Sequence, residues 1–162
     1  MLFRSMESLN AIAQAYDRTI IVSTHPRTRK KIDSMSGHSF DKRIKFMKPF
    51  GLFDYVKLQK HAMCVVSDSG TITEESSILN VPAVTIRQAH ERPEGMDEGT
   101  LIMCGLEPGM VVQSINVARS QCEGGGREFR LVSDYDVDNL SKKVLRIIMS
   151  YTDYVNRTVW FK

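Results

Sequence analysis

The hydrophobic positions of this chain switch repeatedly between helical and strand spacing. Residues 8–16 carry apolar side chains every three or four positions, which predicts a helix, and the β-branched run at 19–23 predicts a strand. The same reasoning predicts further strands over 44–47, 63–66, 83–86 and 100–104, and further helices over 27–34, 52–61, from 72 onward and over 108–118. The chain is therefore a repeated succession of strand, helix and strand.

The predicted strands are short and mostly apolar, without regular alternation of polar side chains. This pattern is typical of strands that are covered on both faces. Strands separated by helices also form parallel sheets. The sequence therefore predicts an α/β fold, with a Rossmann-like parallel sheet and helices on both faces.

The carboxyl-terminal part of the chain has an amphipathic pattern of its own. Asp138 is expected to cap a last helix whose apolar face runs over 140–148. Residues 151–162 retain several aromatic and aliphatic side chains and are too apolar for a disordered end. We expect this tail to pack against another surface. A chain of 162 residues is expected to form one compact domain.

Charge and composition exclude several classes of function. The 22 basic and 19 acidic residues give a net charge of +3, and the basic clusters at 27–31 and 42–43 fit solvated surface better than a nucleic-acid platform. No apolar run approaches the roughly 20 residues of a membrane span, and no signal-peptide pattern is present, so a cytoplasmic protein is expected. The three cysteines and four histidines lack the spacings of disulfide frameworks or zinc sites, and no metal is expected.

The turn after the strand at 63–66 has the features of a phosphate site. Gly70 allows the backbone to approach a ligand, Ser69 and Thr71 offer hydroxyl and N–H donors, and the following helix points its positive end at the turn. Glu75 lies one helical turn beyond Thr71 and can accept hydrogen bonds from ribose hydroxyls, whereas Glu74 is expected to point elsewhere. An ordinary helix capped by a side chain of the turn fits this motif equally well.

Two further polar turns follow predicted strands. His25 comes directly after the strand at 19–23, where its imidazole can bind a phosphate oxygen or transfer a proton, although a solvated loop histidine fits the isolated observation too. The dense polar turn at 90–94 follows the strand at 83–86 and contains His90 and Arg92. Arg92 is the natural partner of an anion there, because its fork engages two oxygens.

These motifs together resemble one known family. The segments 68–75, 91–95 and 99–100, with Pro82 between them, resemble the carboxyl-terminal half of the non-hydrolysing UDP-N-acetylglucosamine 2-epimerases. Segments 23–28 and 155–160 are more similar to the UDP-N-acetyl-L-fucosamine synthases of capsule, O-antigen and lipopolysaccharide pathways. The family pattern usually has a second glycine where Thr71 stands.

The resemblance implies one half of a glycosyltransferase-B type fold, in which a nucleotide sugar lies between two Rossmann-like halves. Residues 1–162 would be the carboxyl-terminal nucleotide-binding domain, with 147–162 as the terminal helix and tail that cross back toward an absent amino-terminal catalytic domain. The resemblance also implies that UDP or a UDP-N-acetylhexosamine is the ligand. It implies these contacts: Ser69, Gly70 and Thr71 with the diphosphate, Glu75 with the ribose, Tyr55 near the uridine, and Arg92 and His25 on the phosphate side.

The implied reaction is inversion at C2 by anti elimination and re-addition of UDP, without a cofactor. The family takes its proton-abstracting carboxylates from the amino-terminal half, so this chain is expected to be nearly inactive alone. The alternatives are a stand-alone or split-gene nucleotide-binding module, a fragment of a glycosyltransferase-B type glycosyltransferase, and a purely structural domain. The apolar tail and the lost partner surface also make a homodimer an open possibility.

Overall fold

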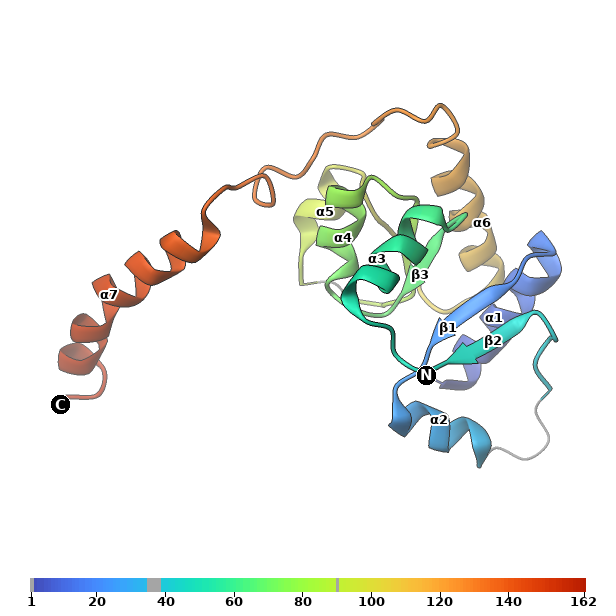
Figure 1. Cartoon of the computed structure of the whole chain (residues 1–162), viewed down its shortest axis with the longest axis horizontal. Helices are drawn as coiled ribbons and strands as arrows, with labels where there is room; N and C mark the ends of the chain where they lie inside the picture. The colour runs from blue at the N-terminus through green and yellow to red at the C-terminus, as the bar shows by residue number, and fades with distance from the viewer. Residues whose placement is uncertain (1, 35–38, 90) are drawn as a thin grey trace. The chain divides into compact units, whose positions relative to one another are not determined.

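The computed structural model describes residues 2–34, 39–89 and 91–162. It contains a first compact unit that ends at Val132 and a second, Ser133–Lys162 (Figure 1). The elements of the first unit, in chain order, are α1 (Leu2–Tyr16), β1 (Ile20–Ser23), α2 (Pro26–Asp33), β2 (Ile44–Met47), α3 (Leu52–His61), β3 (Val65–Ser67), α4 (Ile72–Leu79), β4 (Ala83–Thr85), α5 (Pro93–Asp97), β5 (Ile102–Met103) and α6 (Pro108–Ser120).

The strands of the first unit are all parallel and form two sheets. In one sheet β1 lies beside β2, with Ile20 opposite Ile44 (Figure 1). In the other sheet the order is β3-β4-β5, with Val65 opposite Ala83 and Val84 opposite Ile102. Parallel strands joined by helices confirm the α/β fold that the sequence predicts.

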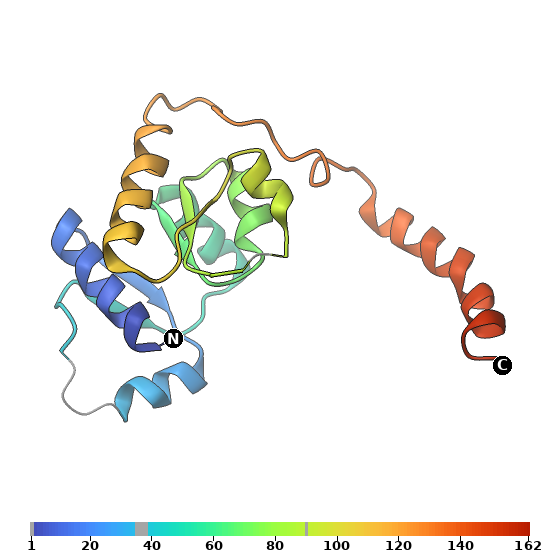
Figure 2. The same cartoon turned by 180° about the vertical axis from the view of Figure 1, so that it is seen from behind.

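The central strand β4 is covered by helices on both faces. Ala83 packs with Ile72 at the start of α4, whereas Val84 packs against a core cluster of Ile12 from α1 and Val111, Ile115 and Ala118 from α6. Figure 2 shows α1 and α6 side by side over this second face. Because adjacent residues of a strand point to opposite faces, the two helical layers enclose the sheet here as predicted.

The sheet of β1 and β2 departs from this prediction. Its residues alternate in burial along both strands, and Ile44 faces α1 while Ile21 and Met47 are 48% and 46% exposed. Helices therefore cover only one face of this sheet among the described residues. In the sequence, the alternation of buried and exposed positions is marked only by the polar residues Ser23 in β1 and Lys45 in β2.

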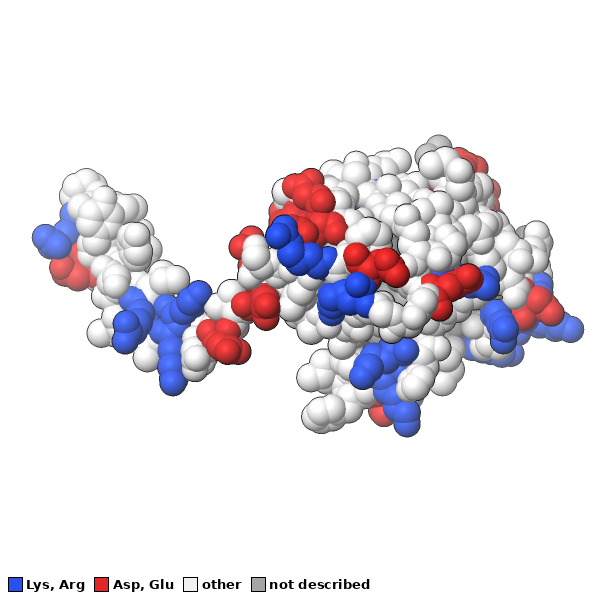
Figure 3. Space-filling view, turned by 90° about the horizontal axis from the view of Figure 1, so that it is seen from above, with Lys and Arg blue, Asp and Glu red and all other residues white. Residues whose placement is uncertain are grey.

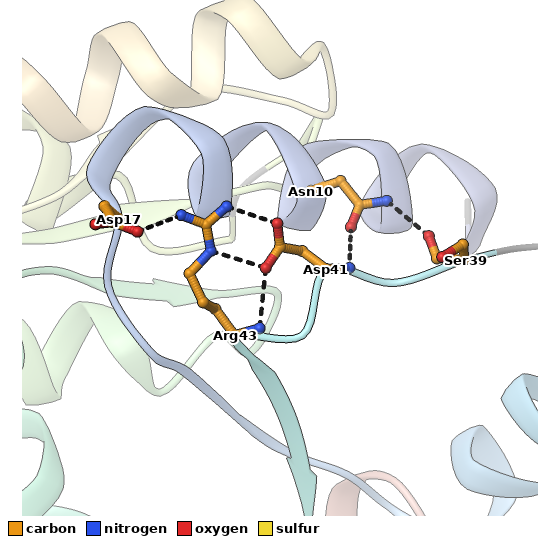
Figure 4. Close-up of polar contacts among 5 residues, drawn as sticks. All are labelled: Asn10, Asp17, Ser39, Asp41 and Arg43. Atoms are coloured by element: carbon orange, nitrogen blue, oxygen red, sulfur yellow. Dashed lines mark hydrogen bonds and ion pairs between the residues drawn. The ribbon is translucent and has the colours of Figure 1, made fainter.

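A cluster of polar side chains holds the loop before β2 against α1 (Figure 4). Arg43 binds Asp41 through Nε at 2.8 Å and Nη2 at 2.6 Å and also reaches Asp17. Asn10 accepts a bond from the Asp41 N–H at 3.0 Å and donates to the Ser39 carbonyl at 3.2 Å. Hydrogen bonds from Arg43 hold the pKa of Asp41 well below its usual range.

Several predicted boundaries move. Helix α1 begins at Leu2 rather than at residue 8, and β5 is shorter than the predicted strand at 100–104. A short helix, α5, forms within the polar turn where no helix is predicted, with Pro93 at its first position. On the face that Figure 3 shows, basic and acidic side chains are interspersed, in agreement with the solvated surface expected from composition.

The second unit consists of one long helix, α7 (Leu140–Thr158), and its flanking segments. Asn139, in the left-handed region at φ 60°, is the N-cap in place of the predicted Asp138. Most of the predicted tail at 151–162 therefore belongs to this helix. All residues of α7 belong to the described part of the chain, and none is buried. No helix of that part is long and apolar enough to cross a membrane.

Candidate functional site

The turn between β3 and α4, residues 69–71 and here named the Gly70 turn, is closed by its own hydrogen bonds. The hydroxyls of Ser69 and Thr71 lie 3.0 Å apart, the Ser69 N–H donates to the Ser67 Oγ at 3.1 Å, and the Thr73 N–H donates to the Gly70 carbonyl at 3.2 Å. Thr71 occupies the N-cap position of α4, and its side chain makes no capping bond. The turn therefore lacks the side-chain capping bond of the ordinary capped helix that the sequence also allowed.

Two guanidinium groups lie against Gly70. A Cβ atom built on Gly70 would overlap Nη1 of Arg92 and would lie 3.3 Å from its Cζ and 3.5 Å from Nη1 of Arg87. Glycine is required here because it has no Cβ atom. The φ of Gly70 is outside the left-handed region, so the constraint is the space beside the turn and not the backbone conformation. Two cations therefore meet the positive end of α4, which is a favourable arrangement for binding an anion.

Each of these arginines also has a glutamate partner. Arg92 Nε lies 3.1 Å from Glu74 Oε1, and Arg87 Nη2 lies 3.0 Å from Glu91 Oε1. The second carboxylate oxygen of Glu74 is buried and has no hydrogen-bond partner among the described residues. Glu74, to which the sequence assigned no role, therefore fixes Arg92 beside the turn.

Glu75 is held by a buried side chain from α3. Gln59, which is 3% exposed, donates from Nε2 to Glu75 Oε2. Tyr55 lies one helical turn before Gln59. Partial burial and the negative charge of Glu75 raise the pKa of the Tyr55 hydroxyl, although a hydrogen bond with Gln59 lowers it in part. The structure thus brings together Tyr55 and Glu75, two residues that the sequence proposed for one ligand.

His25 occupies a different local position. It is the N-cap of α2, where its exposed side chain accepts a bond from the Arg27 N–H at Nδ1, at 3.2 Å. Within the described residues, the hydrogen bond of the His25 side chain goes to α2 and not to the Gly70 turn. Its assignment to the phosphate side therefore stays a prediction. His90, in the second polar turn, lies outside the described residues.

The site contains two residues that sequence reasoning missed. Arg87 follows β4 directly, and Gln59 lies four residues after Tyr55 on the same face of α3. The sequence signal for Arg87 was its position at the end of a strand, and the signal for Gln59 was its helical spacing from Tyr55. No group of three or more potential metal ligands occurs in the part of the chain that the structure describes.

Comparisons with known proteins identify related sequences and folds. The UDP-N-acetylglucosamine 2-epimerase family profile matches residues 2–149. A UDP-N-acetylglucosamine 2-epimerase of Methanococcus maripaludis is 35% identical over 118 residues, which are 71% of this chain and 32% of that protein. The chain thus spans about a third of the length of this curated relative.

Solved structures give the same result. The UDP-N-acetylglucosamine 2-epimerase from Rickettsia bellii is similar with a TM-score of 0.86 and 50% identity, over 99% of this chain and 44% of that chain. The Methanocaldococcus jannaschii UDP-GlcNAc 2-epimerase in complex with UDP-GlcNAc and UDP has a TM-score of 0.77 and 28% identity, over 92% of this chain and 40% of that chain.

Proposed function

Because this chain belongs to the UDP-N-acetylglucosamine 2-epimerase family, we propose that it forms the UDP-binding half of a UDP-N-acetylhexosamine 2-epimerase. The observation that carries the proposal is the convergence of Arg87 and Arg92 on the Gly70 turn at the amino end of α4. The diphosphate of UDP is the group whose charge and size suit this arrangement. Its fold is one half of the glycosyltransferase-B type, like the relatives above.

The rest of the nucleotide follows from the neighbouring side chains. In the proposed pose Ser69, Gly70 and Thr71 bind the diphosphate together with Arg92. Glu75, held in place by Gln59, accepts hydrogen bonds from the ribose hydroxyls, and Tyr55 lies near the uracil. Thr71 replaces the usual second glycine, so its contact uses the backbone N–H and the hydroxyl.

The proposed reaction removes the proton on C2 of the sugar as UDP leaves from the opposite face. This gives a glycal, and UDP then returns as a proton is delivered to the other face of C2. A C2 proton that is not adjacent to a carbonyl is weakly acidic, so the transition state depends on stabilising the leaving diphosphate. The Gly70 turn and Arg92 supply that stabilisation, with His25 as a further candidate.

Proton abstraction is assigned to carboxylates outside this chain, which spans less than half the length of the relatives above. We therefore expect the chain alone to bind UDP and to show little or no epimerase turnover. The proposed setting is the cytoplasmic synthesis of precursors of bacterial surface polysaccharides. The likeness of segments 23–28 and 155–160 to the fucosamine branch stays a prediction within this proposal.

Calorimetric titration with UDP tests the binding role. Replacing Arg92 by Ala should weaken UDP binding about tenfold to a hundredfold, the usual cost of losing a hydrogen bond to a charged group. Arg119→Ala is the matched control. It removes the same charge from α6, where Arg119 forms an exposed ion pair with Glu123. Equal UDP affinity for the unaltered chain and Arg92→Ala would refute the assignment.

A second variant tests how Glu75 is held. Gln59→Leu keeps the size of the side chain while removing the donor to Glu75, and it should weaken UDP binding although Gln59 itself touches no ligand in the proposed pose. An assay for glycal and for the 2-epimer, with UDP-N-acetylglucosamine as the only substrate, tests the location of the proton-transfer groups. Substantial turnover by this chain alone would show that they lie within it.

A further inference from the structure

The segment 127–132, here named the strap, lies against the carboxyl-terminal end of α4. Arg127 donates from Nη1 to the Ser77 carbonyl at 2.7 Å and from Nη2 to the Ile78 carbonyl at 3.3 Å. The Val132 N–H donates to the Ser77 Oγ at 3.0 Å, and both of these residues are buried. The strap therefore supplies donors to carbonyls that lack partners within the helix, and it brings a cation to the negative end of the helix dipole.

The strap also lies against the carboxyl-terminal end of α5. Arg130 donates from Nε to Oε2 of Glu98, the C-cap residue of α5, at 3.0 Å, and its Nη2 binds the other carboxylate oxygen. The ring of Phe129 lies against the next residue, because a Cβ atom built on Gly99 would lie 2.9 Å from its Cδ1. One segment therefore contacts the carboxyl-terminal ends of both helices.

The opposite ends of these two helices carry the proposed diphosphate site. The Gly70 turn leads into α4, and Arg92 is the N-cap residue of α5. The helices pack closely between their ends, because a Cβ atom on Gly95 would overlap the methyl group of Thr73. Helices of eight and five residues are only about 8–12 Å long, so a displacement at one end is carried to the other.

The two helices differ in what holds them. Ile72, at the start of α4, is fully buried and packs with Ala83 of β4, so the sheet fixes α4 directly. Within the described chain, the buried residue of α5 is Gly95, which brings almost no apolar surface to the core. The position of α5 therefore depends on polar contacts at its ends, where Glu98 pairs with the strap and Arg92 pairs with α4.

We propose that Arg127 and Arg130 are positioning residues for Arg92, because the strap connects α5 to α4 and so holds Arg92 beside the Gly70 turn. The inference deepens the proposed function and rests on it for the binding of a diphosphate by Arg92. Neither strap arginine touches the nucleotide in the proposed pose. Their contacts restrict Arg92 before the ligand arrives, which lowers the entropic cost of ordering its side chain on binding.

Hydrogen exchange followed by NMR without nucleotide tests the positioning step. The strap variant combines Arg127→Ala with Arg130→Ala. The signal followed is the Nε–H of Arg92, which lies 3.1 Å from its glutamate partner on α4, and its exchange should be about tenfold faster in the strap variant. The Nε–H of Arg43, which donates to its aspartate partner at 2.8 Å beside β2, is the internal reference and should not change.

Calorimetry with UDP tests the consequence for binding. The strap variant should bind UDP about threefold to tenfold more weakly than the parent chain. Because its effect passes through Arg92, the same two substitutions should weaken binding by less than about twofold in a chain that already carries Arg92→Ala. A merely structural effect would lower the affinity by the same factor in both backgrounds.

A second double variant, Arg119→Ala with Arg157→Ala, is the matched control. It removes the same two charges from exposed ion pairs on α6 and α7, and it should change neither measurement. Equal changes in this control would overturn the proposal, because they would follow from net charge. If the strap variant does not fold, Arg130→Ala alone takes its place, since this arginine is 75% exposed.

Unchanged exchange of the Arg92 Nε–H in the strap variant would overturn the proposal, as would equal losses of UDP affinity in the two backgrounds. The exchange measurement uses no ligand, so it decides on the positioning step whether or not the chain binds UDP. Equal UDP affinity for the parent chain and Arg92→Ala would refute the proposed function instead.

Discussion

Replacing Gly70 by Ala should weaken UDP binding and leave the fold intact. The new Cβ would overlap Nη1 of Arg92 and lie only 3.3 Å from its Cζ, inside an ordinary carbon contact. The backbone at Gly70 accepts alanine, since its φ lies outside the left-handed region. The guanidinium, at the end of a flexible side chain, must therefore move by about 1 Å away from the turn.

The size of the effect follows from what this movement breaks. A displaced Arg92 loses one charge-assisted hydrogen bond to a phosphate oxygen, which is worth about 1.5–3 kcal/mol, or about a tenfold to hundredfold loss of affinity. The fold loses the ion pair between Arg92 and Glu74. Their side chains are 36% and 31% exposed, and a pair of this kind contributes about 0–1 kcal/mol. Binding should therefore fall while the melting temperature changes little.

Calorimetry with UDP and thermal unfolding of the same samples measure both quantities. Gly126→Ala is the matched control, since a Cβ there meets no atom within 4 Å and its backbone is also outside the left-handed region. Unchanged UDP affinity in Gly70→Ala, with Gly126→Ala also unchanged, would show that the ligand does not approach the Gly70 turn.

Other substitutions probe the fold around the site. Gly95→Ala should lower the free energy of unfolding by about 1–3 kcal/mol in urea titrations, because its Cβ would overlap the methyl group of the fully buried Thr73. Asp41→Asn should lower the melting temperature at neutral pH. Hydrogen bonds from Arg43 lower the pKa of Asp41 in the folded chain. The ionised Asp41 therefore stabilises the fold at pH values above its ordinary pKa of about 3.9, and this stabilisation is lost as the pH falls through the lowered pKa. The difference in melting temperature between the variant and the parent should therefore shrink in acid. Burial raises the pKa of Cys64 to about 12, so iodoacetamide at pH 8 should leave this thiol unmodified until urea unfolds the chain, as mass spectrometry would detect.

Local signals were strong enough to predict most helices and strands. β2 and α3 match their predictions residue for residue, since each has a clear pattern bounded by Pro49 or Gly51. Helix α5 was missed because five residues give no periodicity. The arrangement in two sheets could not be predicted. The sequence of a strand indicates which of its faces is buried, but it does not indicate which strands lie beside it.

The site was predictable where it lies within one continuous motif. Ser69, Gly70, Thr71 and Glu75 were proposed from the strand, turn and helix pattern alone, although their role in binding stays a prediction. Arg87 was missed because its relation to Gly70 depends on β4 lying beside β3. Its position at a strand end was the only local signal, and the register that brings it to Gly70 is a property of the folded sheet.

The charge balance at the Gly70 turn decides how a diphosphate binds in the proposed function. Arg87 and Arg92 are already paired with Glu91 and Glu74, so a bound diphosphate competes with two carboxylates for the same guanidinium groups. The positive end of α4 supplies only a fraction of a charge. In the proposed pose the remaining stabilisation comes from the backbone N–H groups of the turn and from the hydroxyls of Ser69 and Thr71.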